Sequence, residues 1–212
     1  MKQSGLFLFF TGLMCLFSCA NDSLQNTDDA QFKKEVLLHD DNPVIETVVD
    51  DIRFKFCLLD KDNVPANSFK VGENFSFCLE MENQQDAIDL KIVKDFIYEL
   101  SVDGFGKVIS PTKGVIGNPF AEVNCTEEFR TFPFFGEDKL CKIVIPWIDR
   151  ERLFSPFPFC FGISPQPALA KGVYYTEVSH EFSFYVPPKT PEDGWSWLHI
   201  GPLTFKINFE IN

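Results

Sequence analysis

Large apolar side chains alternate with polar ones in several short segments from residue 44 onward. Phe54, Phe56 and Leu58 share one face of the segment 53–59, and the segment 75–81 repeats the pattern. Because successive side chains of a strand point to opposite faces, this period of two predicts half-buried strands. The same alternation predicts further strands at residues 96–102, 141–147, 174–186 and 204–211.

Turn-forming Gly, Pro, Asn and Asp separate these segments, and no stretch of ten residues has a helical period. Residues 149–153 predict at most a short helical turn, and residues 110–140 predict a long irregular loop. About seven alternating strands with such turns favour an all-β fold. We therefore predict a single antiparallel β-sandwich, Ig-like in the broad sense but without the Cys and Trp spacing of antibody domains.

The first residues of the chain follow a different pattern. A single Lys2 precedes an apolar run that ends at Ser18, which is the order of a secretion signal. The run is shorter than the roughly 18 to 20 residues that span a bilayer. Residues 19–42 are polar and acidic, which is typical of a flexible tether. The chain thus divides into a signal peptide at 1–18, a tether at 19–42 and a β-sandwich domain at 43–212.

The signal ends in Leu16-Phe17-Ser18-Cys19, which resembles the lipobox of bacterial lipoproteins. The resemblance implies cleavage before Cys19 and acylation of that residue, for example with palmitate. Each buried methylene of an acyl chain contributes about 0.8 kcal/mol, so two or three chains hold a protein on a membrane. The alternatives are an ordinary signal peptide that is cut after Ala20, or acylation at Cys15.

The lipobox, the acidic tether and the Phe-rich sandwich together resemble small, uncharacterised surface lipoproteins of Bacteroidetes-like bacteria. The resemblance implies a lipid-anchored, surface-exposed protein of the outer membrane. It favours a non-catalytic binding module with a glycan or protein ligand. The alternatives are a structural or assembly component of an adhesin or fimbrial system, and a sandwich-type protease inhibitor.

Charge narrows the range of partners. The chain has 19 Lys and Arg against 31 Asp and Glu, a formal net charge of −12. Nucleic-acid binding needs clustered Lys and Arg that displace counterions from phosphates, and the sequence has no such cluster. We therefore expect the membrane, through the lipid anchor, and a glycan or protein as partners, and no nucleic acid.

Apart from Cys15 and the predicted lipid carrier Cys19, the chain has five cysteines: Cys57, Cys78, Cys125, Cys141 and Cys160. An exported chain can keep disulfides, but an odd number leaves at least one thiol outside an internal pair. Cys57 and Cys78 both lie opposite the Phe set of their strands, so they predict a cross-strand disulfide or two partly exposed thiols. A bridge from Cys125 to Cys141 would close the long loop. No pair has the C-x-x-C spacing of zinc or redox motifs.

Catalytic and metal-binding patterns are weak. The histidines are His39 in the tether, His180 on the aligned face of a strand, and His199 at the start of the last strand. Neither G-x-S-x-G nor H-E-x-x-H occurs, so we predict no enzyme and no cofactor. The acidic segment 60–63 does not fit the EF-hand template, because Pro65 stands where glycine is required, and it predicts a solvated turn without metal.

Trp195 and Trp197 follow the Pro-rich loop 187–194. Indole rings at the end of a sandwich can stack on sugar faces and hydrogen-bond to hydroxyl groups. The alternative is that one or both rings pin the loop to the sheet. The segment 154–161, rich in Phe and Pro, predicts core filling or an exposed contact surface.

Overall fold

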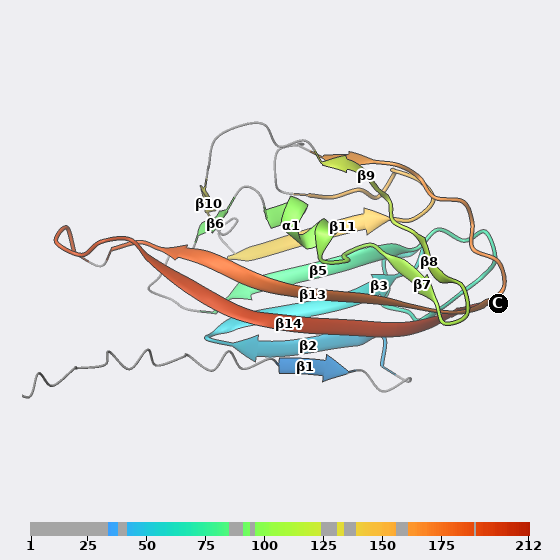
Figure 1. Ribbon diagram of the computed structural model, residues 1–212, viewed down its shortest axis with the longest axis horizontal. Coiled ribbons are helices and arrows are strands. Elements are labelled where there is room, and N and C mark those ends of the chain that lie inside the picture. Colours follow the sequence, from blue (N-terminus) through green and yellow to red (C-terminus); the bar gives the residue numbers. More distant parts are fainter. Residues whose placement is uncertain are drawn as a thin grey trace, which may run out of the picture. The chain divides into compact units, whose positions relative to one another are not determined.

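The computed structural model describes residues 34–37, 42–84, 91–93, 96–123, 131–133, 139–155, 161–188 and 190–212 (Figure 1). By its internal contacts the chain divides into two units, Met1–Ala30 and Gln31–Asn212, and every described element belongs to the second unit. The predicted signal segment and the acylation residue Cys19 lie outside the described residues, so both stay predictions.

The described part of the chain is built from strands and a short helix. Their bounds, in chain order, are β1 (Lys34–Leu37), β2 (Val44–Val49), β3 (Ile52–Leu59), β4 (Ser68–Phe69), β5 (Ser76–Asn83), β6 (Lys91–Val93), α1 (Phe96–Val102), β7 (Val108–Ser110), β8 (Gly114–Gly117), β9 (Phe120–Val123), β10 (Thr131–Pro133), β11 (Leu140–Pro146), β12 (Phe161–Ile163), β13 (Gly172–Val186) and β14 (Ser196–Ile211).

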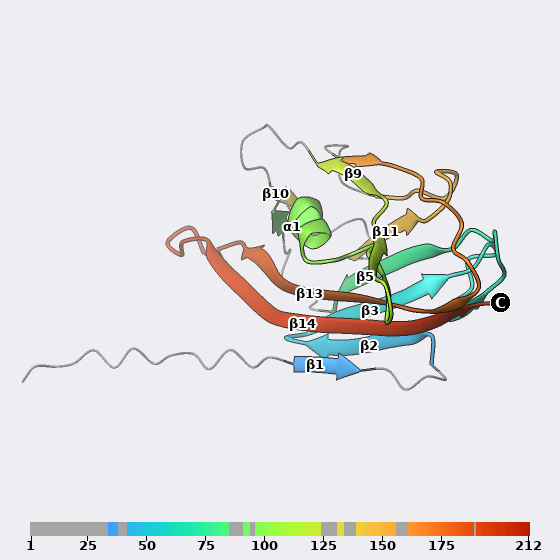
Figure 2. The same cartoon turned by 45° about the vertical axis from the view of Figure 1, so that its right-hand side comes forward.

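Two main sheets face each other across a common core. The eight-stranded sheet has the order β1-β14-β13-β6-β10, with β4 on β14, β7 on β13 and β8 on β7. The four-stranded sheet has the order β11-β5-β3-β2, and β9 and β12 form a separate pair. Figure 2 shows the long β13–β14 hairpin alongside β2 and β3. The predicted all-β sandwich is therefore confirmed, whereas the Ig-like relationship stays a prediction.

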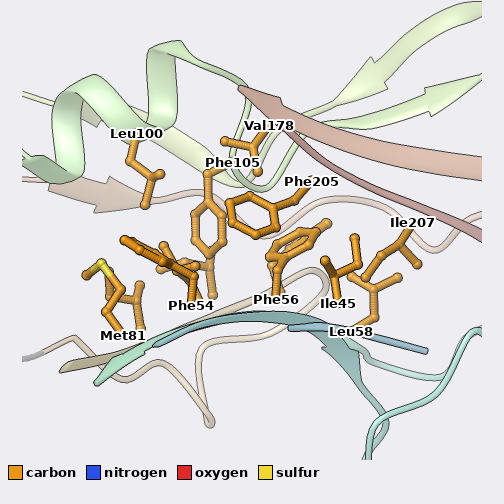
Figure 3. Close-up of a cluster of buried hydrophobic side chains, with 14 of the residues drawn as sticks. Ile45, Phe54, Phe56, Leu58, Met81, Leu100, Phe105, Val178, Phe205 and Ile207 are labelled. Atoms are coloured by element: carbon orange, nitrogen blue, oxygen red, sulfur yellow. The ribbon is translucent and has the colours of Figure 1, made fainter. Parts of the chain in front are cut away.

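The core consists mainly of the apolar faces that the alternation predicts. Phe54 and Phe56 of β3 are fully buried and reach toward the opposite sheet (Figure 3). The ring of Phe54 lies 4.6 Å from that of Phe182, and the ring of Phe56 lies 5.9 Å from that of Phe205. Burial of one such side chain stabilises the fold by about 1.5–3 kcal/mol, so these contacts hold the two sheets together.

Residues 96–102 form the helix α1, so the strand predicted there is wrong. Phe96, Ile97 and Leu100 are buried, whereas Tyr98 and Val102 are exposed. The spacing i, i+1, i+4 places the three buried side chains on one face of a helix. Alternation would instead place Tyr98 and Val102 beside Phe96 and Leu100 and put Ile97 on the opposite face, so the burial of Ile97 distinguishes the helix from a strand.

Other parts of the chain also differ from the prediction. Residues 110–140 contain the short strands β8, β9 and β10 where a loop is predicted, and the start of that range is the end of β7. The short helical turn predicted at 149–153 is a turn without helix. Both β1 and β4 run parallel to β14, so the eight-stranded sheet is mixed rather than purely antiparallel.

The strand β1 lies within the segment 19–42 that the composition assigns to the tether. Its residues pair in register with β14, from Lys34 beside Leu203 to Leu37 beside Lys206. The folded unit therefore begins before residue 43, because backbone pairing with an edge strand orders a segment that composition alone assigns to a tether. Among the described residues, no helix is both long and apolar enough to cross a membrane.

Candidate functional site

The β13–β14 hairpin is the longest element of the fold, and its far end bends away from the sandwich. The register shifts between His180 and Phe182, which marks a β-bulge. Gly201 lies opposite this point with φ of 109°, and a Cβ there would lie 2.6 Å from the backbone nitrogen of Leu203. Only glycine fits this position. Both views show the hairpin end extending past the ends of β2 and β3 (Figures 1 and 2).

We call residues 182–188 and 190–200 the hairpin tip. On its inner face, Phe182 and Phe184 of β13 and Ile200 of β14 are buried against the core. On its outer face, Tyr185 pairs with Trp197 and Ser183 pairs with His199. The inner face attaches the tip to the core, which leaves the outer face to be explained.

Aromatic rings cover the outer face of the tip. The ring of Tyr185 lies 3.7 Å from that of Trp197 and 6.0 Å from that of Trp195. His199 continues the series, with its ring 5.8 Å from Trp197 and nearly parallel to it. We call these four residues the aromatic row. Two of them, Trp197 and His199, lie two positions apart on β14, which places their side chains on the same face.

Both indoles are exposed, Trp195 by 52% and Trp197 by 42%. The prediction left open whether these residues pin the loop to the sheet or offer their rings to a ligand. Trp197 rests on Tyr185, yet neither indole enters the core. The third tryptophan, Trp147, is 1% exposed and stacks on Phe75 in the core, as an indole with a structural role does. The exposure favours the ligand-binding interpretation.

Polar groups lie directly beside the aromatic row. The imidazole Nδ1 of His199 lies 2.9 Å from the hydroxyl Oγ of Ser183 and 3.6 Å from Oε1 of Glu181. A serine-protease triad places its serine on one ring nitrogen and its carboxylate on the other. Here both groups lie on the same nitrogen, so this arrangement does not form a triad. Its hydroxyl, imidazole and carboxylate can instead exchange hydrogen bonds with ligand hydroxyl groups.

A depression of about 370 Å³ adjoins Ser183 and Glu181 on the side of α1. Its remaining lining residues are Tyr98, Glu99, Val102, Asp103 and His180. Nδ1 of His180 lies 2.7 Å from Oδ2 of Asp103, and burial lowers the pKa of His180 although Asp103 opposes that shift. This contact ties Asp103, the residue that follows α1, to β13 next to the tip.

The cysteines predicted as disulfide partners are free thiols where they are described. Cys57 and Cys78 lie in register on β3 and β5, on the face opposite the Phe set, and both are buried rather than partly exposed. Cys141 lies on the inner face of β11, in phase with the core as predicted. Cys125 and Cys160 lie outside the described residues, so the predicted bridge from Cys125 to Cys141 stays a prediction.

The acidic segment 60–63 forms a turn. Oδ1 of Asp60 accepts hydrogen bonds from the backbone nitrogens of Asp62 and Val64, so this carboxylate is used within the turn. No group of three or more His, Cys, Asp or Glu within the described residues is placed to hold a metal ion. Phe154, in the segment predicted to fill the core or form a contact surface, is 53% exposed, and residues 156–160 lie outside the described part.

Tyr185 is the site residue that sequence reasoning missed. The sequence did contain an indication of its position. In the predicted strand, Tyr185 lies on the face opposite Phe182 and Phe184, which is the outer face. Its contact with Trp197 depends on the register of the hairpin, and the loop of the hairpin does not fix that register from sequence.

Comparisons with protein-family models, curated proteins and solved structures find no match to this chain. The interpretation of the aromatic row therefore rests on the residues and their geometry.

Proposed function

We propose that this chain is a lipid-anchored surface protein that binds a neutral glycan through the aromatic row of its hairpin tip. The observation that carries the proposal is the exposure of Trp195 and Trp197 at the end of the hairpin. Apolar rings gathered on an exposed face are typical of binding sites. The fold supplies rigidity, because the inner face of the same hairpin is part of the core.

The chemistry of the row suits a sugar chain. Aromatic faces pack against the C–H groups of a pyranose ring, and the indole nitrogens can donate to its hydroxyl groups. Ser183 and His199 offer further donors and acceptors at the edge of the rings. A two-stranded hairpin end is narrow, which fits a linear chain better than the broad surface that a protein partner usually covers.

Charge indicates that the glycan is neutral. The chain has a net charge of −12, and Glu181 lies at the end of the row, with Glu192 and Asp193 in the loop of the tip. A polysaccharide that carries carboxylates or sulfates would be repelled by these groups, and the repulsion would weaken as salt screens it. A neutral polysaccharide meets no such barrier.

Retardation in native gels that contain a polysaccharide tests this function. A set of neutral polysaccharides should include at least one that retards the wild type. Trp197→Ala and Tyr185→Ala should weaken that retardation at least tenfold, because a central aromatic contact is typically worth more than about 1.4 kcal/mol. Phe154→Ala is the matched control: it removes an equally exposed ring away from the tip and should leave retardation unchanged.

The proposal fails if no neutral polysaccharide retards the wild type, or if the tip variants and Phe154→Ala are retarded equally. Cross-linking of Trp197 to a protein on intact cells, without any polysaccharide retardation, would instead assign the tip to a protein ligand.

The anchor is tested separately. Cys19→Ala should give an unlipidated protein in the soluble fraction, because the acyl chains carry the membrane affinity. Incorporation of labelled palmitate by this variant, together with its recovery in the membrane pellet, would overturn the lipoprotein assignment. The result leaves glycan binding untouched, since the aromatic row lies far along the sequence from Cys19.

A further inference from the structure

Two cysteines lie side by side on the outer face of the four-stranded sheet. The row across this face runs Val144, Cys78, Cys57 and Val44, and we call it the thiol row. Outer faces of sheets are usually wet, but Cys57 is 1% exposed and Cys78 is 0% exposed. The two thiols, Leu59 and Val144 form a small apolar cluster that is distinct from the main core.

Backbone hydrogen bonds define how the two cysteines face each other. The nitrogen and the oxygen of Val144 both bond to Phe154, at 2.7 and 3.0 Å, and so point away from β5. Val144 and Cys78 are therefore a non-hydrogen-bonded pair of the antiparallel ladder. The backbone nitrogen and oxygen of one residue point to the same side of an antiparallel strand. Those of Cys78 do not bond to β11 and therefore point toward β3, which makes Cys57 and Cys78 a hydrogen-bonded pair.

This register places the two Cα atoms within the span of a disulfide. The Cα atoms of a hydrogen-bonded antiparallel pair are about 5.5 Å apart, within the range of about 4.4–6.8 Å that disulfides span. Neither strand has to move along the other to bring the sulfur atoms together. Cys57 and Cys78 lie on the two central strands of the sheet, whose positions are fixed by neighbours on both sides.

The two thiols are chemically different. A hydrogen bond from Cys78 lowers the pKa of Cys57, with the ammonium groups of Lys55 and Lys142 acting in the same direction. The pKa of Cys78 is raised by its hydrogen-bond contact with Cys57 and by burial. We therefore assign the first attack to Cys57 and the second to Cys78, which lies beside it in register.

Cys141 provides the internal contrast. It lies on the inner face of the same sheet, where its partner in register on β5 is Met81. Burial raises the pKa of Cys141 to about 12, and no cation contributes to that shift. This thiol has the environment of an inert core residue.

We propose that Cys57 and Cys78 form a disulfide by exchange with a disulfide oxidant of the export compartment. The Cys57 thiolate attacks one sulfur of the oxidant, which gives a mixed disulfide and releases one thiol. Cys78 then attacks the Cys57 sulfur, which breaks the mixed disulfide, and its proton passes to the leaving thiolate, which departs as the second thiol. Two protein thiols lose two electrons, and one oxidant disulfide gains them.

The bond joins the central strands across a segment of about twenty residues that includes β4. Closing such a segment restricts the unfolded chain and stabilises the folded one. For a domain of this size the restriction corresponds to a rise of about 6 to 12 °C in Tm. The disulfide would thus hold together the sheet that faces the hairpin.

Peptide mapping tests the bond directly. The full chain is exported from a bacterial host, its thiols are trapped with N-ethylmaleimide in denaturant, and trypsin is added without reductant. Cleavage at Lys and Arg puts each of the five cysteines on its own peptide: 56–61, 71–91, 114–130, 140–142 and 153–171. Peptides 56–61 and 71–91 should be recovered linked to each other, lighter by two hydrogens than their sum.

Recovery of both peptides with maleimide, or linkage of either one to another cysteine peptide, would overturn the proposal. A second arm removes the dependence on compartment: because both thiols are buried in the folded chain, the reduced chain is refolded from urea with oxidised glutathione and should give the same linked peptides. If the Cys19→Ala test overturns the lipid anchor, the result expected with oxidised glutathione stays the same.

Thermal unfolding with and without reductant supplies the variant test. Reductant should lower the Tm of the wild type and of Cys141→Ala by about 6 to 12 °C, and should leave the double variant Cys57→Ser/Cys78→Ser unchanged. A wild type whose Tm does not respond to reductant would contradict the bond. If the double variant does not fold, the peptide map of the wild type decides the question alone.

Discussion

The outer face of the four-stranded sheet carries charges in pairs, whereas the outer face of the hairpin tip carries exposed aromatic rings. On the four-stranded sheet, Glu80 bonds to Lys142 at 2.7 Å and to Lys55 at 3.2 Å. Arg53 bonds to Glu82 on the neighbouring strand. These charges satisfy one another within the sheet and have little to offer a partner.

At the tip, Tyr185, Trp197 and His199 contact one another through their rings and leave much of their surface in water. Large exposed rings cost solubility, which the acidic loop and the net charge of the chain offset. The difference between the two faces indicates where to look for function: the polar groups of the four-stranded sheet satisfy one another, whereas the exposed rings of the tip are the candidate binding surface.

The largest difference is expected between the two faces of the tip itself. Phe182→Ala removes a fully buried ring that packs on Phe54, so it should lower the free energy of unfolding by about 3–5 kcal/mol. Trp197→Ala should cost less than about 1 kcal/mol, since its ring is half in water. Urea unfolding followed by circular dichroism measures both. A cost of Trp197→Ala that equals that of Phe182→Ala would make the indole structural.

The next-largest change in stability is expected at the paired charges of the four-stranded sheet. Glu80→Gln leaves Lys55 and Lys142 without their anion and should cost about 1–2 kcal/mol near pH 7. Glu46→Gln is the control, because Glu46 lies at the edge of the same row, 3.6 Å from Arg53, and should cost less than about 0.5 kcal/mol. Equal costs from urea unfolding would show that the central pairing adds nothing.

Glu80 should also make the free energy of unfolding depend on pH. Burial opposes ionisation of Glu80, but the hydrogen bonds from Lys142 and Lys55 outweigh it and lower its pKa below 4.5. This contribution to stability is present above pH 4.5 and is lost as pH falls through the folded pKa. The curve of unfolding free energy against pH should therefore drop less steeply in acid for Glu80→Gln than for the wild type.

Protonation of His180, which lies beside the tip, should also lower the stability of the fold, at a higher pH than protonation of Glu80. Burial lowers the pKa of His180 below 6.5, against the opposing effects of Asp103, Glu99 and Glu181. The unfolded state then binds the proton first, so stability is complete above about pH 6.5 and falls as pH drops toward the folded pKa. His180→Phe, which suits the neighbouring aromatic rings, should remove this part of the pH profile. An unchanged profile would show that titration of His180 does not cause this part of the pH dependence.

The smallest effect is expected on the polar part of the outer hairpin face. Lys206 bonds to Glu177 at 3.0 Å and lies 4.4 Å above the ring of Tyr175. Because these groups are partly exposed, Lys206→Ala should cost less than about 1 kcal/mol and should leave polysaccharide retardation unchanged. Loss of retardation in this variant would extend the binding site beyond the aromatic row.

The alternation of side chains was sufficient to predict the sandwich but not all of its elements. Phe54, Phe56 and Leu58 are separated by single polar or small residues, so only one period fits them and their buried face was predicted correctly. At 96–102 both a strand and a helix bury Phe96 and Leu100, and the contacts with β13 decide in favour of the helix.

The candidate site was predicted only in part, for a physical reason. Trp195 and Trp197 stand out in the sequence, but whether an indole is core or surface depends on where the hairpin bends relative to the sandwich. That bend needs Gly201 opposite the bulge after His180, a pairing between residues far apart in the chain. The contact with Tyr185 and the burial of Cys57 and Cys78 likewise follow from register, which alternation alone does not specify.

The central claim is that Trp195 and Trp197 bind the glycan, and tryptophan fluorescence tests it most directly. Of the three tryptophans, only Trp147 is buried, so added acrylamide should quench the emission of the exposed pair. Saturation with the retarding polysaccharide should shift the emission to shorter wavelength and reduce that quenching severalfold. Emission and quenching that stay unchanged while the polysaccharide is bound would contradict the account.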